Sequence, residues 1–230
     1  MTLVLPRAAT ATVCELATAG LPTVGMRMPS HAVARALLAA AGRPIAAPSA
    51  NRSGHVSATQ AAHVAEDLAD VDVLILDGGP TLVGLESTVI DATGDEAVIL
   101  RHGGIARAAI EDVTGRPVQA ATGEAHMPAS PGMLARHYAP QTPLRLNAEA
   151  PHAGEAWLGF GPDPAEAAQA TARFSLSASG DLLEAAANLF AAMRALDAAG
   201  ARAIAVAPIP AQGLGEAITD RLRRAALGRG

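Results

Sequence analysis

One loop of the sequence, residues 46–57, concentrates small polar side chains that could hold a polar ligand. It follows a short apolar run at residues 44–47 and precedes a helical pattern that opens at Ser57, so we expect it to join a strand to a helix. Gly54 lets the backbone approach a ligand, and the amides of the following helix N-terminus attract phosphate or carboxylate. A plain turn has the same composition, so the loop alone leaves both interpretations open. The polar residues are Ser49, Asn51, Ser53 and Ser57.

Arginine and serine side chains near the ends of apolar runs are the second group of candidates. Arg27 closes the run that starts at Val24, and Ser87 and Arg101 lie in two later runs beside glycines. A guanidinium can bind a carboxylate or a phosphate through two parallel hydrogen bonds. For an isolated arginine, solvation or a surface ion pair is the ordinary alternative.

Several kinds of chemistry are excluded by residues that the sequence lacks. All 17 basic residues are arginine, which excludes a phosphate loop that ends in Gly-Lys and any mechanism that needs a lysine from this chain. The seven histidines are scattered without metal-ligand spacing, so we expect no metal site. The single cysteine, Cys14, cannot form an internal disulfide, and we expect it to be a small buried residue.

The composition is that of a globular protein. Its 230 residues are 50% hydrophobic, which is enough to fill one large or two smaller cores. No run of about 18 apolar residues occurs and the first residues do not resemble a signal peptide, so we expect a cytoplasmic protein without a membrane contact. The net charge of −5 argues against a chain whose main task is to grip nucleic acid.

The elements that must position the candidates follow from the hydrophobic pattern. Before residue 118 it predicts strands at 3–5, 24–28 and 71–77, a hairpin from 84–91 and 97–104, and helices at 31–41 and 106–113. Ser57 followed by Gln60 matches a capping box and predicts a helix to about residue 68, so Ser57 is a cap, a ligand contact or both. After residue 143, alternating strands and helices predict a small parallel α/β sheet.

Several separate segments are similar, in order and spacing, to one known family. These segments are 47–54, 77–80, 84–89, 99–105, 130–133, 136–140, 213–218 and 220–222. The chain resembles the threonylcarbamoyl-AMP synthase family in its long form. The resemblance implies an α/β fold: a YrdC-like twisted mixed sheet with helices over residues 1–118, incomplete at its N-terminus, a linker or lid at 119–142, and a Rossmann-like parallel α/β domain at 143–230.

The same resemblance implies an enzyme of the nucleotidyltransferase class. It would form threonylcarbamoyl-AMP and pyrophosphate from ATP, L-threonine and bicarbonate, with Mg²⁺ carried by ATP. The product would go to a downstream tRNA threonylcarbamoyl transferase complex, and a weak contact with RNA is also implied. The alternative is a non-catalytic fragment that retains nucleotide or double-stranded RNA binding.

The resemblance also assigns residues to the two substrates. No catalytic residue is assigned, because the family's N-terminal Lys-x-Arg motif has no counterpart in this chain, which therefore looks like the C-terminal portion of the enzyme. His102 stands where relatives usually have proline. The implied threonine contacts are Arg27, Ala47 and Ser87. The implied ATP contacts are Thr23, Ser49, Asn51, Ser57, Arg101, His137 and Tyr138.

Overall fold

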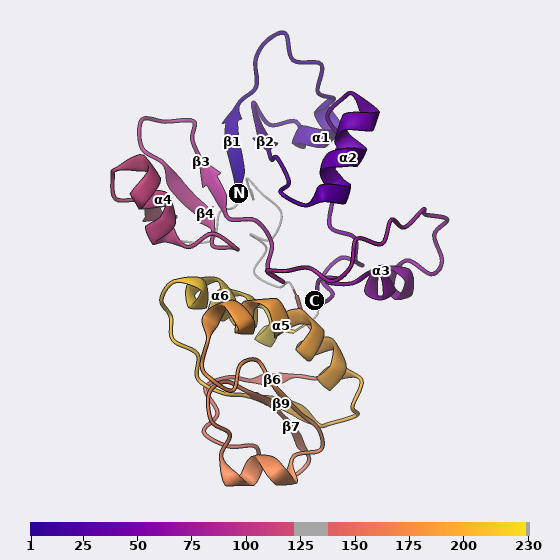
Figure 1. The fold of residues 1–230 in the computed structure, drawn as a ribbon, viewed down its shortest axis with the longest axis vertical. Coiled ribbons are helices and arrows are strands. Elements are labelled where there is room, and N and C mark those ends of the chain that lie inside the picture. Colours follow the sequence, from indigo (N-terminus) through magenta and orange to yellow (C-terminus); the bar gives the residue numbers. More distant parts are fainter. Residues whose placement is uncertain (122–137, 229–230) are drawn as a thin grey trace. The chain divides into compact units, whose positions relative to one another are not determined.

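The structure of the chain is a computed structural model that describes residues 1–121 and 138–228 (Figure 1). It divides into two compact units, each made of two stretches of sequence. The first unit consists of Met1–Ser49 and Ser87–Met133, and the second consists of Ala50–Glu86 and Leu134–Gly230. The division that the sequence predicts at residues 119–142 stays a prediction.

The elements of the first unit are β1 (Thr2–Pro6), α1 (Glu15–Thr18), β2 (Thr23–Met26), α2 (Ala32–Ala41), β3 (Val89–Asp91), β4 (Val98–Arg101), α4 (Arg107–Thr114) and β5 (Gln119–Ala120). Those of the second unit are α3 (Ala61–Asp67), β6 (Leu144–Arg145), β7 (Glu155–Gly159), the 3-10 helix η1 (Ala165–Gln169), β8 (Arg173–Ser175), α5 (Leu182–Asp197), β9 (Ala203–Val206) and α6 (Leu214–Ala226).

The first unit is built on a mixed sheet, as predicted, with the strand order β2-β1-β3-β4-β5. β1 pairs with β2 and β3 with β4 in antiparallel fashion, whereas β1–β3 and β4–β5 are parallel. The predicted hairpin is confirmed by the β3–β4 pairing, which sets Val89 opposite Arg101. A small core of Ile90, Ile99, Ile110 and Val118 joins this sheet to α4.

Helix α2 confirms the predicted helix, and its boundaries have local causes. It ends at Gly42, whose φ of 61° is a left-handed conformation that suits glycine. The apolar side chains Val33 and Leu37 are 39% and 46% exposed, and no residue of the helix is buried. Cys14 is exposed, so its predicted burial is wrong; it lies directly before the four-residue helix α1, among exposed residues.

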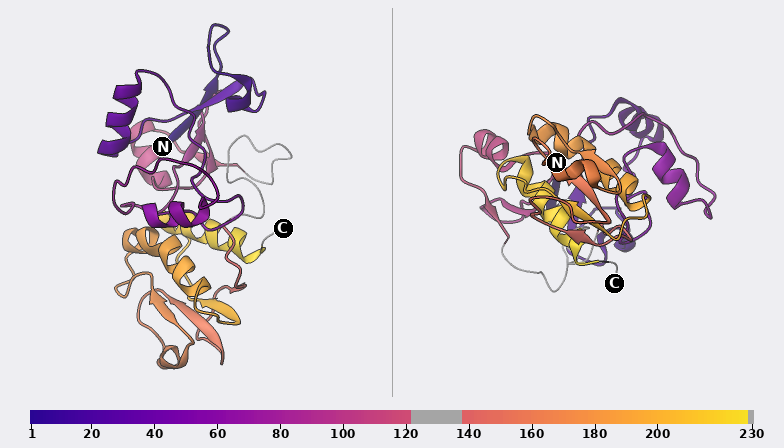
Figure 2. Two further views of the ribbon diagram at one scale, coloured as in Figure 1. Left: turned by 90° about the vertical axis from the view of Figure 1, so that its right-hand side faces the viewer. Right: turned by 90° about the horizontal axis from the view of Figure 1, so that it is seen from below.

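The second unit contains the predicted parallel sheet, with the strand order β6-β9-β7-β8 and only parallel pairs. Side chains alternate between its two faces, because successive residues of a strand point in opposite directions. Ala156 and Leu158 of β7 join the larger core, which α5 and α6 cover. Trp157 lies on the other face and packs with Ala167 of η1. Figures 1 and 2 show α5 and α6 together on one side of this sheet.

The predicted strand at residues 71–77 is wrong. These residues form no strand, and Val71, Leu74 and Leu76 are 52%, 89% and 54% exposed. A strand needs a neighbour that accepts and donates its backbone hydrogen bonds, and no described segment pairs with these residues. An apolar run therefore shows that a segment has the composition of a strand, but not that a neighbouring strand is present to pair with it.

A buried ion pair supports the edge of the second sheet. The Glu155 carboxylate is 5% exposed and accepts hydrogen bonds from Arg145 Nε at 3.0 Å, Arg145 Nη2 at 2.5 Å and the His152 amide at 2.8 Å. The hydrogen bonds from Arg145 lower the pKa of Glu155 from its ordinary 4.5 to about 2, against the opposing effect of burial. Because the pKa is lower in the folded state, the pair stabilises the fold above pH 4.5, and this contribution is lost as the pH falls toward 2.

We expect Arg145→Gln to lower the free energy of unfolding at neutral pH by about 2 kcal/mol, since it leaves a buried carboxylate without its cation. The figure is below the usual range for buried pairs because Arg145 is itself 34% exposed. The variant should also lose most of the pH dependence between about 4.5 and 2. Urea denaturation followed by circular dichroism at a series of pH values measures both effects. An unchanged pH profile would contradict this assignment, and the exposed Arg173→Gln is the matched control.

Within residues 1–121 and 138–228, no helix combines the length and the apolar composition that crossing a bilayer requires.

Candidate functional site

Ser87 and Arg101 are brought together by the hairpin of the first unit. Arg101 ends β4 and Ser87 precedes β3, and the Arg101 side chain donates hydrogen bonds to the Ser87 carbonyl oxygen from Nε at 3.2 Å and from Nη2 at 2.9 Å. Arg101 Nη2 also lies 3.3 Å from Ser87 Oγ. Both side chains are half-buried. The family resemblance implies that Arg101 contacts ATP and Ser87 contacts threonine. The structure joins these two candidates in one hydrogen-bonded cluster.

Thr2 and Thr88 complete this cluster, and the sequence analysis gave neither a role. Thr2 Oγ1 lies 2.8 Å from Ser87 Oγ, and the Thr2 amide donates to the Thr88 carbonyl oxygen at 2.8 Å. The buried Thr88 hydroxyl donates to the Ile105 carbonyl oxygen at 2.7 Å and accepts from the Ile105 amide at 3.0 Å. Thr88 therefore fixes the glycine-containing turn after Arg101. The only feature of the sequence that pointed to Thr88 was its place in the segment 84–89, which resembles the family.

Four other candidates, Thr23, Arg27, Ala47 and Ser49, belong to the first unit. Thr23 begins β2 and is half-buried, and Arg27 follows β2 and is exposed. Ala47 and Ser49 lie in an exposed irregular stretch after α2. Residues 44–47 form no strand, so the strand predicted directly before the polar loop is wrong. Their assignments to ATP and threonine remain predictions.

Asn51 closes the polar loop in the second unit. It is 8% exposed, and its Nδ2 donates to the carbonyl oxygens of Arg52 at 3.0 Å and His55 at 3.2 Å. Gly54 has a φ of 80°, a conformation that favours glycine, and its carbonyl oxygen accepts a hydrogen bond from the Ala139 amide at 2.9 Å. The loop is thereby tied to residue 139, which lies in the predicted linker.

Ser57 is not a helix cap in the structure, so this part of the prediction is wrong. Helix α3 begins four residues later at Ala61, and its N-cap Gln60 makes no side-chain capping hydrogen bond. The Ser57 hydroxyl instead donates to Glu86 Oε1 at 2.6 Å. The Ser57 side chain is thus held by a charged acceptor 29 residues away and not by a helix that starts at its own position, so the local capping pattern does not form.

Arg194 of α5 holds the end of this loop. Its Nη2 donates to the Val56 carbonyl oxygen at 2.6 Å and to Asp67 Oδ2 at 2.7 Å. Its Nε lies 3.4 Å from the Ser57 carbonyl oxygen. Burial would raise the pKa of Asp67, but the hydrogen bonds and charge of Arg194 lower it below the ordinary value. Nothing local in the sequence pointed to Arg194, because its partners lie more than a hundred residues earlier in the chain.

Tyr138 packs inside the second unit. Its φ is 64°, and its ring, 1% exposed, stacks on Phe190 with the centroids 5.5 Å apart. The guanidinium carbon of Arg221 lies 5.1 Å from the Tyr138 ring centroid, within the range of a cation–π contact. The predicted ATP contact of Tyr138 stays a prediction, and that of His137 lies outside the described residues.

Arg221 connects Tyr138 with Glu86. Its side chain is 0% exposed, its Nε donates to Glu86 Oε2 at 2.9 Å, and its Nη1 donates to Asp220 Oδ2 at 2.8 Å. Burial would lower the pKa of Arg221, whereas the neighbouring Tyr138, Glu86 and Asp220 raise it above the ordinary value. The guanidinium therefore stays charged. Arg221 lies in the segment 220–222 that resembles the family, but the sequence indicated no role for it.

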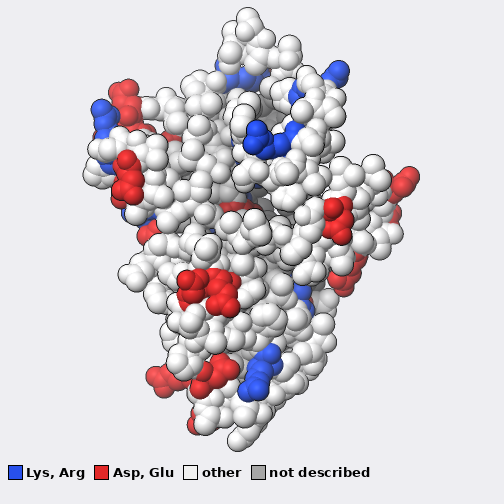
Figure 3. All heavy atoms as spheres, viewed as in Figure 1, with Lys and Arg blue, Asp and Glu red and all other residues white. Residues whose placement is uncertain are grey.

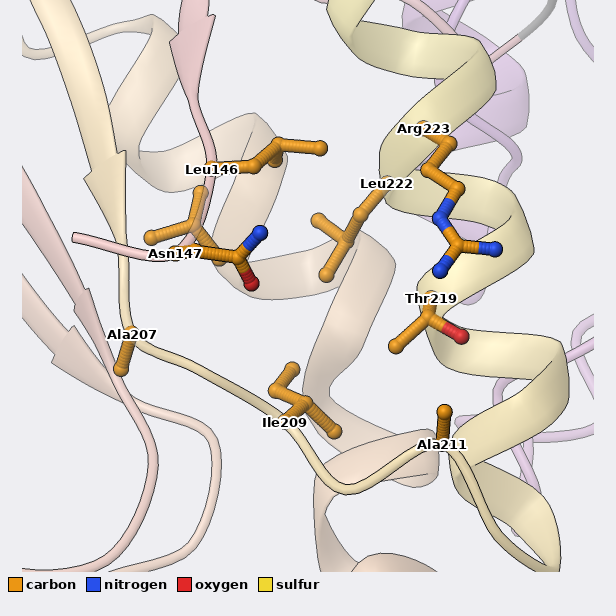
Figure 4. Close-up of a pocket in the computed structure, with 9 residues that line it drawn as sticks. Leu146, Asn147, Ala207, Ile209, Ala211, Thr219, Leu222 and Arg223 are labelled. Atoms are coloured by element: carbon orange, nitrogen blue, oxygen red, sulfur yellow. The ribbon is translucent and has the colours of Figure 1, made fainter.

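A pocket of about 80 Å³ lies at the carboxyl ends of β6 and β9, beside α6 (Figure 4). Asn147, Ile209, Thr219 and Arg223 are among the residues that line it. Carboxyl ends of parallel strands are a usual place for ligands, but this volume is well below the 300–1,000 Å³ typical of small-molecule sites. It is too small for a nucleotide, and no candidate residue lines it. Among the described residues, no group of three or more His, Cys, Asp or Glu could hold a metal ion.

Comparisons with known proteins match nearly the whole chain. A family model described as "Telomere recombination" matches residues 1–103, and one described as "Threonylcarbamoyl-AMP synthase, C-terminal domain" matches residues 105–227. The threonylcarbamoyl-AMP synthase of Bacillus subtilis is 40% identical over 227 residues, which cover 92% of this chain and 65% of that protein. That of Pyrococcus abyssi is 40% identical over 244 residues, which cover 98% of this chain and 69% of that protein.

Two solved structures are similar to the fold. The crystal structure of P. abyssi Sua5 complexed with L-threonine has a TM-score of 0.86 at 36% identity, covering 98% of this chain and 69% of that one. A variant of P. abyssi Sua5 with a histidine and the next residue, a tyrosine, changed to alanine has a TM-score of 0.85 at 35% identity, covering 98% and 68%. The chain thus spans about two thirds of the length of these relatives.

Proposed function

Because this chain belongs to the threonylcarbamoyl-AMP synthase family, we propose that it forms threonylcarbamoyl-AMP and pyrophosphate from ATP, L-threonine and bicarbonate. The observation that best supports the proposal is the pairing of Arg101 with Ser87, which sets a fixed positive charge beside a hydroxyl group. The P. abyssi relative was solved with L-threonine, which supports threonine as a substrate here. Because the proposed reaction transfers the AMP part of ATP, we propose that the chain is a nucleotidyltransferase.

The proposed reaction joins three small molecules and needs positioning more than covalent catalysis. The threonine amine condenses with bicarbonate to a carbamate, and water leaves. A carbamate oxygen then attacks the α-phosphorus of ATP, and the bond from that phosphorus to the departing pyrophosphate breaks. Negative charge gathers at the phosphorus, where a preorganised guanidinium stabilises the transition state. The chain has no lysine, so arginines supply every side-chain positive charge apart from protonated histidine. ATP would enter as its Mg²⁺ complex.

Within the proposal, Arg101 faces the phosphates of ATP, while Arg27, Ala47 and Ser87 receive threonine. Thr23 and the loop residues Ser49, Asn51 and Ser57 would contact the nucleotide, and His137 and Tyr138 would act from the linker. The chain contains one His-Tyr pair, and the P. abyssi variant changed such a pair. The product would pass in the cytoplasm to a transferase complex that modifies tRNA.

Binding of double-stranded RNA is the weaker candidate, because it needs a continuous basic surface. On the face shown in Figure 3, basic and acidic side chains are interspersed with wide uncharged areas. The net charge is −5. The enzyme is therefore the function we propose.

We expect the purified 230-residue chain to release pyrophosphate from MgATP in the presence of bicarbonate, with a rate that depends on L-threonine. The dependence follows from the mechanism, since without the amine no carbamate forms to attack the phosphorus. A coupled phosphate assay with and without L-threonine measures it, with L-alanine as the control substrate. Nucleotide binding without threonine-dependent release would favour the non-catalytic alternative and would contradict the proposal for this chain.

A further inference from the structure

We propose that the pocket at the carboxyl ends of β6 and β9 binds a small carboxylate that carries a short aliphatic chain. The carboxylate group would lie against Arg223 at the mouth of the pocket, and the chain would lie against its apolar lining. Among the described residues that line the pocket, none is proposed to contact ATP or threonine. The inference therefore goes beyond the proposed function and does not depend on it.

The pocket lies where two neighbouring strands continue to opposite faces of their sheet. Strands β6 and β9 are parallel and paired with each other. After β9 the chain leads to α6, which packs on the face of the larger core through Ile218 and Leu222. After β6 the chain leads to Ala148, which packs with Trp157 on the other face. In open parallel sheets, the crevice that such a divergence leaves at the carboxyl ends of the strands is the usual place for a ligand.

Asn147 makes the change of face after β6. Alternation along a strand would place residue 148 on the same face as Leu144 and Leu146, which pack against the larger core. Asn147 has a φ of 54°, a left-handed conformation that asparagine tolerates, and Ala148 packs in the other core. Figure 4 shows the Asn147 amide group directed toward α6. The turn thus gives the pocket a polar group that can both donate and accept hydrogen bonds.

Most of the pocket lining is apolar, and its volume suits a molecule of few atoms. Leu146, Val206, Ile209 and Leu222 contribute to this lining, and Val206 and Leu222 belong to the buried core. A volume of about 80 Å³ has room for about six groups of the size of water. An aliphatic chain gains free energy when it leaves water for such a surface. The pocket therefore fits a short chain with one carboxylate group.

Arg223 supplies the positive charge at the mouth of the pocket. It is exposed and lies one helical turn after Thr219, and Figure 4 shows its guanidinium group beside Thr219. Asp220, the nearest acidic residue in the sequence of α6, pairs with Arg221 at 2.8 Å and with Arg224 at 2.9 Å. In the parts of the chain that the structure describes, no carboxylate forms an ion pair with Arg223. Its guanidinium can therefore bind a carboxylate from solution through two parallel hydrogen bonds.

Two kinds of molecule share this chemistry: short-chain carboxylic acids and aliphatic amino acids. The Thr219 hydroxyl donates to the Gly215 carbonyl oxygen at 2.7 Å, so toward the pocket it can only accept a hydrogen bond. An ammonium group next to the carboxylate could donate to it. An inorganic anion lacks the chain that the apolar lining would bury, and an aliphatic amine would meet the positive charge of Arg223.

The test titrates the purified chain with butyrate and follows the side-chain amide signals of Asn147 by NMR, which report on this pocket. We expect saturable shifts with a dissociation constant on the order of 1 mM, within the range for a ligand of this size. Butylamine and inorganic phosphate each lack one of the two features and should bind at least about tenfold more weakly. L-2-aminobutyrate adds an ammonium group to the same chain. Tighter binding than butyrate would identify an amino acid as the ligand, and equal or weaker binding a simple acid.

Two variants separate the contribution of the charge from that of the cavity. Arg223→Gln should weaken butyrate binding about tenfold, because it removes the charged donor. Ala211→Leu keeps the charge and places a larger side chain in the lining, so it should weaken butyrate binding as well. Arg173→Gln, at an exposed arginine of the same unit, is the control and should keep the parent affinity. Circular dichroism checks that each variant is folded, and Arg223→Gln carries the test if Ala211→Leu is not.

Three results would overturn the inference. They are the absence of saturable shifts at Asn147 with butyrate, equal binding of butyrate, butylamine and phosphate, and an unchanged affinity for butyrate in Arg223→Gln. Pyrophosphate release that depends on threonine is measured in a separate assay. Failure of either the pocket or the enzyme activity would leave the other standing.

Discussion

An Arg101→Gln variant is expected to release pyrophosphate about 100-fold more slowly than the parent chain at equal substrate concentrations. Removal of one preorganised charge from a transition state commonly costs a factor of this size. Arg101 is preorganised because its Nε and Nη2 are bound to the Ser87 carbonyl oxygen, so the guanidinium does not have to find its orientation during the reaction. The coupled assay with ATP, bicarbonate and L-threonine gives the rate.

Two further variants sharpen this expectation. Arg101→Lys keeps the charge but cannot make the two-pronged contact with Ser87, so we expect it to fall between the parent and the glutamine variant. Arg116→Gln removes an exposed arginine of the same unit and should stay close to the parent rate. If Arg101→Gln retains the parent rate within a few-fold, Arg101 does not face the phosphates.

The second large effect is expected on stability, from Arg194→Gln. Arg194 and Asp67 are 15% and 7% exposed and lie 2.7 Å apart, and removal of one partner of a buried pair costs about 3 kcal/mol. Glutamine would leave Asp67 without its cation and the Val56 carbonyl oxygen without its donor. Chemical denaturation followed by circular dichroism measures the loss.

The pH dependence gives this prediction its check. Arg194 lowers the pKa of Asp67 in the folded state, so the pair stabilises the fold above the ordinary pKa of 3.8. The difference between parent and variant should therefore be full at neutral pH and shrink as the pH falls below 3.8. Arg173→Gln, at an exposed arginine, should change stability by less than about 0.5 kcal/mol. A difference that persists unchanged at low pH would show that Arg194 acts through something other than Asp67.

Much of the C-terminal half could be predicted because its signals are local. Asp181 caps α5 by accepting from the Glu184 amide at 2.7 Å, and the alternation of apolar runs gives β7, β8 and β9 at their observed places. The hairpin of β3 and β4 is also local, and its register is what joins Ser87 to Arg101.

The remaining features depend on partners that a local pattern does not reveal. Residues 71–77 have the composition of a strand but no strand to pair with among the described residues. Ser57 matched a capping box, but in the structure its hydroxyl donates a hydrogen bond to Glu86. Arg221 is separated by 135 residues from Glu86, so only the fold could show that the two meet.

The aromatic residues are distributed unequally, and this has an optical consequence. The first unit has no aromatic residue. All five belong to the second unit: Tyr138, Trp157, Phe160, Phe174 and Phe190. The indole of Trp157 is 2% exposed, and its Nε1 donates to Asp163 at 2.8 Å. Indole fluorescence and near-ultraviolet absorbance therefore report on the second unit alone, while far-ultraviolet dichroism reports on both. The unlabelled protein thus carries a built-in probe that separates the unfolding of its two units without any added dye.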